Sequence, residues 1–184
     1  MDGLAPARLI ELWPEIVATK TRDWIAENVL GGQLSALDFV LRDAPESDPD
    51  IYLSFDYSDA DVRFMKTLPP LTRGRGSASL LDGRFVALVD QGQVTAPTGG
   101  VSDVAGSSFI VPDIGVKDGA PGVVRLILDG PVPAALSLLD QPPLNVMQKA
   151  GLSPDIASGR LKAQGTLSLP LRKGIDTNEI RYDA

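Results

Sequence analysis

The acidic stretch from Asp43 to Asp50 is the densest group of candidate metal ligands in the chain. Its carboxylates, from Asp43, Glu46, Asp48 and Asp50, suit calcium chelation, because hard cations bind several oxygen ligands. The stretch lacks the glycine hinge and the distal glutamate of an EF-hand loop, and two prolines interrupt it. We therefore interpret it as a solvated turn, with calcium binding as the alternative.

The segment Arg73-Gly74-Arg75-Gly76-Ser77 is the one glycine-rich stretch with positive charge that suggests anion binding. A phosphate-binding loop requires the pattern GxxxxGK[ST] between a strand and a helix. This segment lacks that pattern, and strands are expected on both sides of it. It is interpreted as a turn at a strand entry with two exposed arginines, and contact with a lipid phosphate is the weaker alternative.

Cysteine and histidine are both absent from the 184 residues. Their absence excludes thiol nucleophiles, Ser-His-Asp triads, zinc fingers and histidine-ligated metal sites within the chain. The 24 acidic residues offer many pairs, but no pair is set apart by environments that would separate its pKa values. We predict a non-enzyme without cofactor or metal. A hydrolase that uses two carboxylates is a distant alternative, behind the two binding functions given below. Trp13 and Trp24 are expected to anchor the core.

Charge and hydropathy limit the partners of the chain. A formal charge of −7 argues against an electrostatic surface for nucleic acid and against a polybasic patch for anionic lipids. No window approaches the 18–20 apolar residues of a membrane span, and the first residues lack the order of a signal peptide. If the chain works outside the cytoplasm, we expect it to be part of a longer protein. Its length fits one domain over residues 1–184.

Strict alternation of apolar and polar residues marks the segment Leu161–Leu171, LKAQGTLSLPL. A period of two indicates a strand with one apolar and one polar face. The same pattern recurs at Leu37–Leu41, at Ile51–Tyr57 and at Val124–Leu128. Several half-buried strands must therefore place their apolar faces against a common partner.

The remaining elements are predicted from turn and helix signals. Spacing around Lys20, Trp24 and Ile25 predicts an N-terminal helix that begins near Pro14 and ends at Gly31-Gly32. Asp82-Gly83 predicts a two-residue hairpin, and Leu68–Gly76 is expected to be irregular. Two short helices are predicted at Pro133–Asp140 and Pro143–Ala150. The predicted strands are Gln33–Arg42, Ile51–Phe64 (bent at Ser58–Ala60), 77–81, 84–90, Gln93–Ala96, Ser108–Pro112, Val123–Asp129, Gly159–Leu171 and Glu179–Tyr182. These elements predict a mainly β (α+β) fold.

A series of short sequences in a fixed order resembles a known family. The pieces are LWP (12–14), TRDWIAENVLGG (21–32), LPPLTRGRGS (68–77), LDGRFVALVDQGQV (81–94), FIVPD (109–113), VVRLILDGPVPAALSLLDQPPL (123–144) and GRLKAQGTLSLPL (159–171). Their order resembles the central module of YhdP-like proteins of the AsmA superfamily. The resemblance covers nearly the whole chain, which looks like an internal segment of such a protein.

The resemblance implies a curved antiparallel sheet that forms an open groove with an apolar interior. It implies a segment of a conduit that carries phospholipid between the inner and outer membranes, in the periplasm, within a parent protein anchored in the inner membrane. The implied partners are phospholipid acyl chains and adjacent groove segments of the same parent, with membrane contact only through other parts of it. The candidate groove residues are Leu37, Phe39, Leu41, Ile51, Leu53, Phe55, Phe85, Val89, Val124, Leu126, Leu128, Leu161, Leu167 and Leu169.

Two alternatives remain open from the residues alone. Alternating strands most often bury their apolar face against another layer of the same domain, so a closed core competes with an open groove. A non-catalytic structural or adaptor module, whose strand edges pair with neighbouring segments or with a partner, is the second functional hypothesis.

Overall fold

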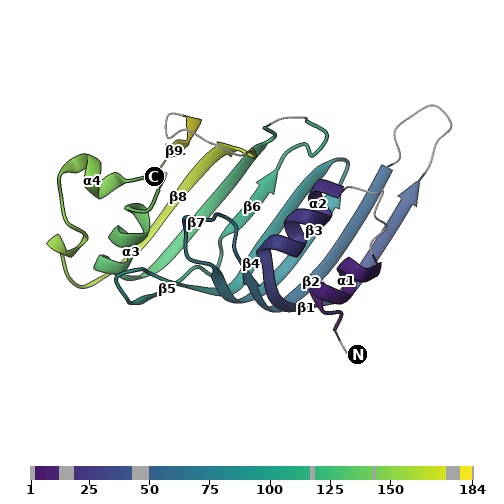
Figure 1. The fold of residues 1–184 in the computed structure, drawn as a ribbon, viewed down its shortest axis with the longest axis horizontal. Coiled ribbons are helices and arrows are strands. Elements are labelled where there is room, and N and C mark those ends of the chain that lie inside the picture. Colours follow the sequence, from purple (N-terminus) through teal and green to yellow (C-terminus); the bar gives the residue numbers. More distant parts are fainter. Residues whose placement is uncertain are drawn as a thin grey trace.

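The computed structural model describes residues 3–12, 19–42, 50–116, 119–142, 144–172 and 179–183. These residues form one antiparallel sheet of nine strands, accompanied by short helices (Figure 1). The strands are β1 (Val29–Arg42), β2 (Asp50–Val62), β3 (Leu71–Leu81), β4 (Arg84–Thr95), β5 (Val101–Asp103), β6 (Ser108–Val111), β7 (Pro121–Pro131), β8 (Arg160–Pro170) and β9 (Arg181–Asp183). The helices are α1 (Pro6–Leu12), α2 (Thr19–Asn28), α3 (Val132–Leu139), α4 (Val146–Ala150) and the 3-10 helix η1 (Pro154–Ile156).

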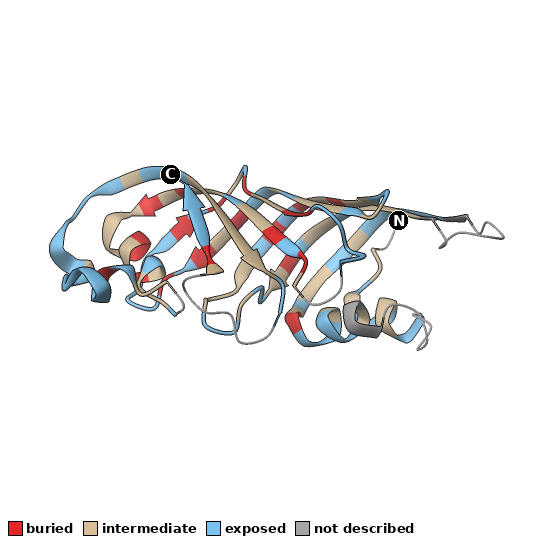
Figure 2. Ribbon diagram, turned by 90° about the horizontal axis from the view of Figure 1, so that it is seen from above, coloured by how far each residue is buried: buried red, intermediate tan, exposed pale blue. Residues whose placement is uncertain are grey.

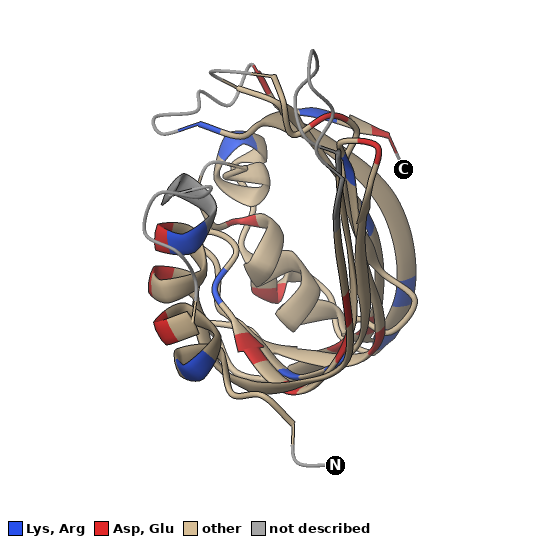
Figure 3. Cartoon of the chain, turned by 90° about the vertical axis from the view of Figure 1, so that its right-hand side faces the viewer, with Lys and Arg blue, Asp and Glu red and all other residues tan. Residues whose placement is uncertain are grey.

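The sheet is a meander in which strands that follow one another in sequence are neighbours in space. Its order is β1-β2-β3-β4-β5-β7-β8-β9, and β6 also lies between β4 and β7. β5 pairs with one end of β4 and β6 with the other end. Seen end-on, the sheet curves as an arc with the helices on its inner side (Figure 3). No helix within the described residues is long and apolar enough to cross a membrane.

The predicted mainly β fold is confirmed, and so are several of its elements. β8 matches the alternating segment, and α3 follows β7 as predicted. Asp82 and Gly83 both have positive φ, 49° and 73°, as a two-residue hairpin turn of this kind requires. Asp59, with φ of 49°, marks the predicted bend of β2, where the pairing with β3 shifts register.

Three predictions of local structure differ from the structure. The second N-terminal helix ends at Asn28, and Gly31-Gly32 lies inside β1 instead of stopping the helix. The stretch Leu68–Gly76 is only partly irregular, because β3 begins at Leu71. Arg73 takes up the irregularity as a single residue with φ of 53°. β4 also continues without a break through Gln93 to Thr95, where only a separate short strand was expected.

The buried core consists of aliphatic side chains, many of them alanine or valine. Its apolar members are Ala60, Ala78, Val94, Ala96, Val104, Ile110, Val111, Ala120, Leu128, Ala134, Ala135, Met147 and Ile180. No aromatic side chain in the described part of the chain is among them. Buried segments are short and alternate with half-buried and exposed ones (Figure 2). Trp24 is 44% exposed, so its predicted role as a core anchor is wrong, and Trp13 lies outside the described residues.

A candidate apolar ligand-binding face

The pairing register places apolar residues of successive strands in a row on one face of the sheet. Directly opposed residues in an antiparallel ladder point to the same face. Phe39 of β1 opposes Leu53, and Leu53 opposes Leu80. The row continues across β4 and β6 through Phe85 and Val111.

A second row lies one step along the strands on the same face. Phe55 opposes Ala78, Ala78 opposes Ala87, and Ala87 opposes Phe109. The row then continues through Val124 of β7 and Leu167 of β8. Both rows cross the sheet without a polar residue in these strands, since side chains of one face recur at every second position.

The thirteen candidate groove residues whose side chains the structure describes, all except Leu41, lie on this face, which we call the apolar face. Gly76 opposes Val89, and Gly130 opposes Leu161, which places Val89 of β4 and Leu161 of β8 on it. Leu37 precedes Phe39 by two residues and follows the bulge at Ala36, where φ is 50°. Ala78, Leu80, Ala87, Phe109 and Val111 also belong to the face, and sequence patterns missed them because only the register brings them in line.

The apolar face is the concave face of the sheet. Gly130 lies on it, and a Cβ at Gly130 would be 2.9 Å from the Cβ of Ser102. Ser102 has no exposed surface, and α3 contacts both β5 and β7. Figure 3 places the helices on the inner side of the arc. One end of the concave face is therefore covered by α3.

Exposure of the candidate residues falls from β1 towards β7. Phe39 is 57% exposed and Leu37 is 47% exposed, whereas Leu128 is only 8% exposed. Leu128 is thus part of the buried core, whereas Leu37 and Phe39 on β1 are open to solvent. The side chain of Leu41 lies outside the described part of the chain. The other ten residues are half-buried.

The opposite, convex face, which we call the polar face, carries more polar side chains, although Val86, Ile110 and Val123 form an apolar row across it. Ser54 opposes Ser79, and Asp56 opposes Ser77, between strands whose apolar residues point the other way. A shallow depression of about 260 Å³ lies on this side, bordered by these serines together with Val86 and Leu88. The two sides of the sheet therefore differ in chemistry as the alternation predicts.

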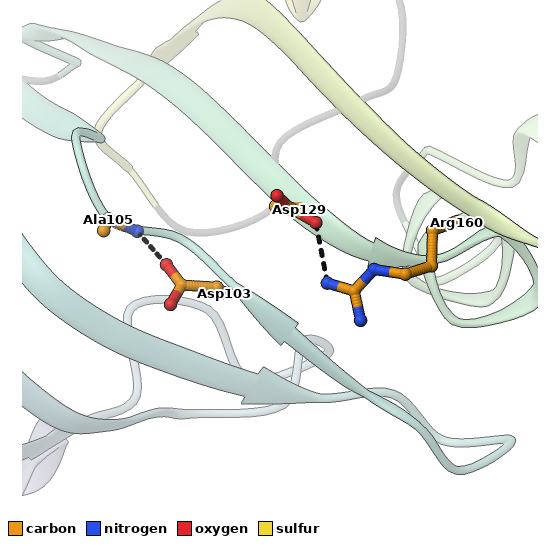
Figure 4. Close-up of polar contacts among 4 residues, drawn as sticks. All are labelled: Asp103, Ala105, Asp129 and Arg160. Atoms are coloured by element: carbon orange, nitrogen blue, oxygen red, sulfur yellow. Dashed lines mark hydrogen bonds and ion pairs between the residues drawn. The ribbon is translucent and has the colours of Figure 1, made fainter.

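Charged residues at the α3 end of the sheet bond to one another and to the backbone. Asp103 and Asp129 occupy opposed positions on β5 and β7. The carboxylate of Asp103 accepts a 2.7 Å hydrogen bond from the Ala105 N–H, and Asp129 pairs with Arg160 at 2.8 Å (Figure 4). The first contact stabilises the turn after β5, and the second links β7 to β8. Within the described residues no group of three or more acidic side chains is arranged to hold a metal ion.

The structure describes only part of the two segments that the sequence suggests for ion binding, the acidic stretch Asp43–Asp50 and the segment Arg73–Ser77. Asp43, Glu46 and Asp48 lie outside the described residues, and Asp50 opens β2. Arg73 and Arg75 are exposed, as expected, but they lie within β3 instead of in a turn before it.

Tyr57 is a polar residue on the apolar face, next to Phe55 along β2. Its hydroxyl donates a 2.6 Å hydrogen bond to the carbonyl of Leu88. Burial, with the negative charge of Asp90 adding to it, raises the pKa of Tyr57 to about 12. The alternation in β2 predicts the face of this tyrosine but not its partner two strands away.

Comparison of the chain with protein-family models, with curated proteins and with solved structures found no match. The resemblance to YhdP-like proteins therefore stays a prediction, and the geometry of the apolar face is the basis for a function.

Proposed function

We propose that the concave apolar face binds the hydrocarbon chains of phospholipids, as an open groove within a lipid-transfer conduit of the cell envelope. The observation that carries the proposal is the register, which aligns on one face the thirteen candidate residues whose side chains the structure describes. The sequence resemblance adds the setting: a periplasmic segment of a longer protein anchored in the inner membrane, passing phospholipid between the two membranes. Adjacent groove segments of that protein would continue the face.

The energetics of lipid transfer require such a face and little else. Each CH₂ group moved from hydrocarbon into water costs about 0.8 kcal/mol, so two ordinary acyl chains cost roughly 20 kcal/mol. A carrier has to cover the chains with apolar surface throughout transfer. Aliphatic and aromatic side chains on a concave sheet provide this cover without a catalytic group.

The core of the protein is incomplete, and this supports the proposal that the apolar face binds a ligand. The chain has a solvent-accessible surface of 11725 Å², whereas a compact monomer of 19.5 kDa has roughly 8500 Å². None of the five phenylalanines is buried, although the structure describes all of them. Large apolar side chains normally close a core, so their exposure favours binding of hydrocarbon over a closed domain.

Native mass spectrometry of the protein after incubation with phosphatidylglycerol–phosphatidylethanolamine vesicles tests the proposal. Leu167 and Ser168 are adjacent in β8 and lie on opposite faces. Leu167→Asp places a charge on the apolar face and is expected to abolish bound phospholipid, while Ser168→Asp is expected to retain it. Circular dichroism confirms that both variants fold. Absence of lipid from the parent protein, or equal occupancy in the two variants, contradicts the proposal.

A structural or adaptor module is the second candidate function, and the outer edge of β1 favours it. Phe39 and Val40 point to opposite faces of that strand and are both exposed, at 57% and 40%. An exposed apolar edge strand is a site for pairing with another strand. This function predicts a protein partner and no bound lipid, so the same mass spectra separate the two candidates.

A further inference from the structure

The outer edge of β1 is open over its second half. β1 is the first strand of the sheet and pairs with β2 on one side (Figure 1). Leu4 closes the first half of its other side through two backbone hydrogen bonds with Leu34, of 2.7 and 2.9 Å. Among the residues that the structure describes, none pairs with this outer side between Leu37 and Arg42.

The open edge lacks the usual protection against strand pairing. Exposed edges are normally blocked by proline, by lysine or by a bulge within the strand. Residues 37–42 (LDFVLR) contain neither proline nor lysine, and the bulge at Ala36 precedes them. Leu37, Phe39 and Val40 are 47%, 57% and 40% exposed, which leaves apolar surface on both sides of the backbone edge.

We propose that this edge pairs antiparallel with the same edge of a second copy of the chain, about a two-fold axis at Val40. An interface of this symmetry requires a surface that is complementary to itself. The axis at Val40 places Phe39 across from Leu41 of the second copy, at backbone positions that oppose Leu53 and Ile51 of β2. On the polar face it places Asp38 across from Arg42, with opposite charges in both directions around the axis.

Other registers lose this match. An axis at Phe39 sets Asp38 across from Val40 and leaves both charges unmatched. A shift by a single residue sets the apolar face of one copy beside the polar face of the other, because side chains alternate along a strand. The register at Val40 is therefore the one that satisfies both faces, and it joins the two apolar faces into one continuous surface. This inference is independent of the proposed lipid binding.

The dimer is expected to be weak, because a ladder of five residues on each side is small for a protein interface. A covalent trap suits such a contact, and the chain has no cysteine of its own. Opposed Cα atoms in an antiparallel pair lie about 4.5 or 5.5 Å apart, and both values are within reach of a disulfide. Val40→Cys is therefore expected to form a disulfide-linked dimer under mild oxidation.

Leu88→Cys is the matched control, since Leu88 is an aliphatic residue of the polar face with a similar exposure of 46%, in the interior strand β4. It is expected to stay monomeric. Sedimentation velocity provides a second readout: Asp38→Arg should weaken the concentration-dependent dimer, and the double variant Asp38→Arg/Arg42→Asp should restore it. Cross-linking of Val40→Cys no faster than that of Leu88→Cys, or loss of the dimer in the double variant, overturns the proposal.

Discussion

The hydroxyl of Tyr57 in β2 reaches across β3 and donates a 2.6 Å hydrogen bond to the carbonyl of Leu88 in β4. The residue between them is Gly76, which opposes Tyr57 on one side and Val89 on the other. Only the missing side chain of this glycine leaves room for the tyrosine to cross. The contact lies at the end of the regular part of the apolar face, where the pairing of β3 with β4 shifts register.

Removal of the tyrosine hydroxyl should lower stability in a pH-dependent way. Tyr57→Phe is expected to cost about 1 kcal/mol in the free energy of unfolding at neutral pH. The folded-state pKa of Tyr57 is about 12, against an ordinary value of 10.0. The folded protein thus holds the proton more tightly, and the contribution of this group is complete below pH 10 and is lost between pH 10 and pH 12.

Urea denaturation of both proteins at pH 8 and at pH 11 measures this effect. The difference in unfolding free energy between the parent protein and Tyr57→Phe should shrink at the higher pH. Lysine and arginine titration affects both proteins alike and cancels in the comparison. A difference that stays constant with pH would show that the pKa of this tyrosine is not raised.

Gly76 should not tolerate a side chain. A Cβ at this position would overlap the carbonyl oxygen of Leu88 and lie 2.7 Å from the Tyr57 hydroxyl. Gly76→Ala is expected to destabilise the protein by about 1–3 kcal/mol, the usual range for overpacking. Gly31→Ala in β1 is the control, because the nearest atom to its Cβ, in Asp61, is 3.8 Å away. Thermal unfolding followed by circular dichroism measures both, and equal melting temperatures would refute this account.

Two buried serines should respond oppositely to replacement by alanine. Ser107 Oγ donates to the Ile127 carbonyl at 3.1 Å and accepts from the Ile127 N–H at 2.9 Å. Ser107→Ala leaves both backbone groups without this partner and should cost about 1–3 kcal/mol. Ser102 is fully buried and its hydroxyl has no hydrogen-bond partner. Ser102→Ala should therefore be neutral or stabilising in a chemical denaturation series, and a larger loss at Ser102 than at Ser107 would contradict the assignment.

Local patterns in the sequence predicted those elements whose signals are themselves local. The alternation at Leu161–Leu171 and the Asp82-Gly83 turn depend on neighbouring residues only, and both are found. The glycines of Leu71–Gly76 indicate a turn by their composition, but they lie within β3. Their missing side chains let Ala60 and Tyr57 of the neighbouring strand approach the β3 backbone closely. Gly32 likewise allows a close approach of Ala60 within β1, so Gly31-Gly32 is not the helix stop that its composition indicates.

The candidate face was predicted residue by residue but not as a surface. Periodicity within one strand cannot give the register between strands, which places Ala78 and Ala87 between Phe55 and Phe109. It also cannot predict that α3 contacts β5 as well as β7, or that Leu128 is buried. Both features arise from contacts between residues far apart in the chain.

Site-specific photo-crosslinking tests the central claim most directly. Leu53 and Ser54 are neighbours in β2, and the register places them on the apolar and the polar face, respectively. A benzophenone side chain is introduced at either position, and the protein is irradiated with phospholipid vesicles and analysed by mass spectrometry. The account predicts a phospholipid adduct from position 53 and none from position 54. Equal labelling at the two positions, or none at position 53 in a folded protein, would contradict it.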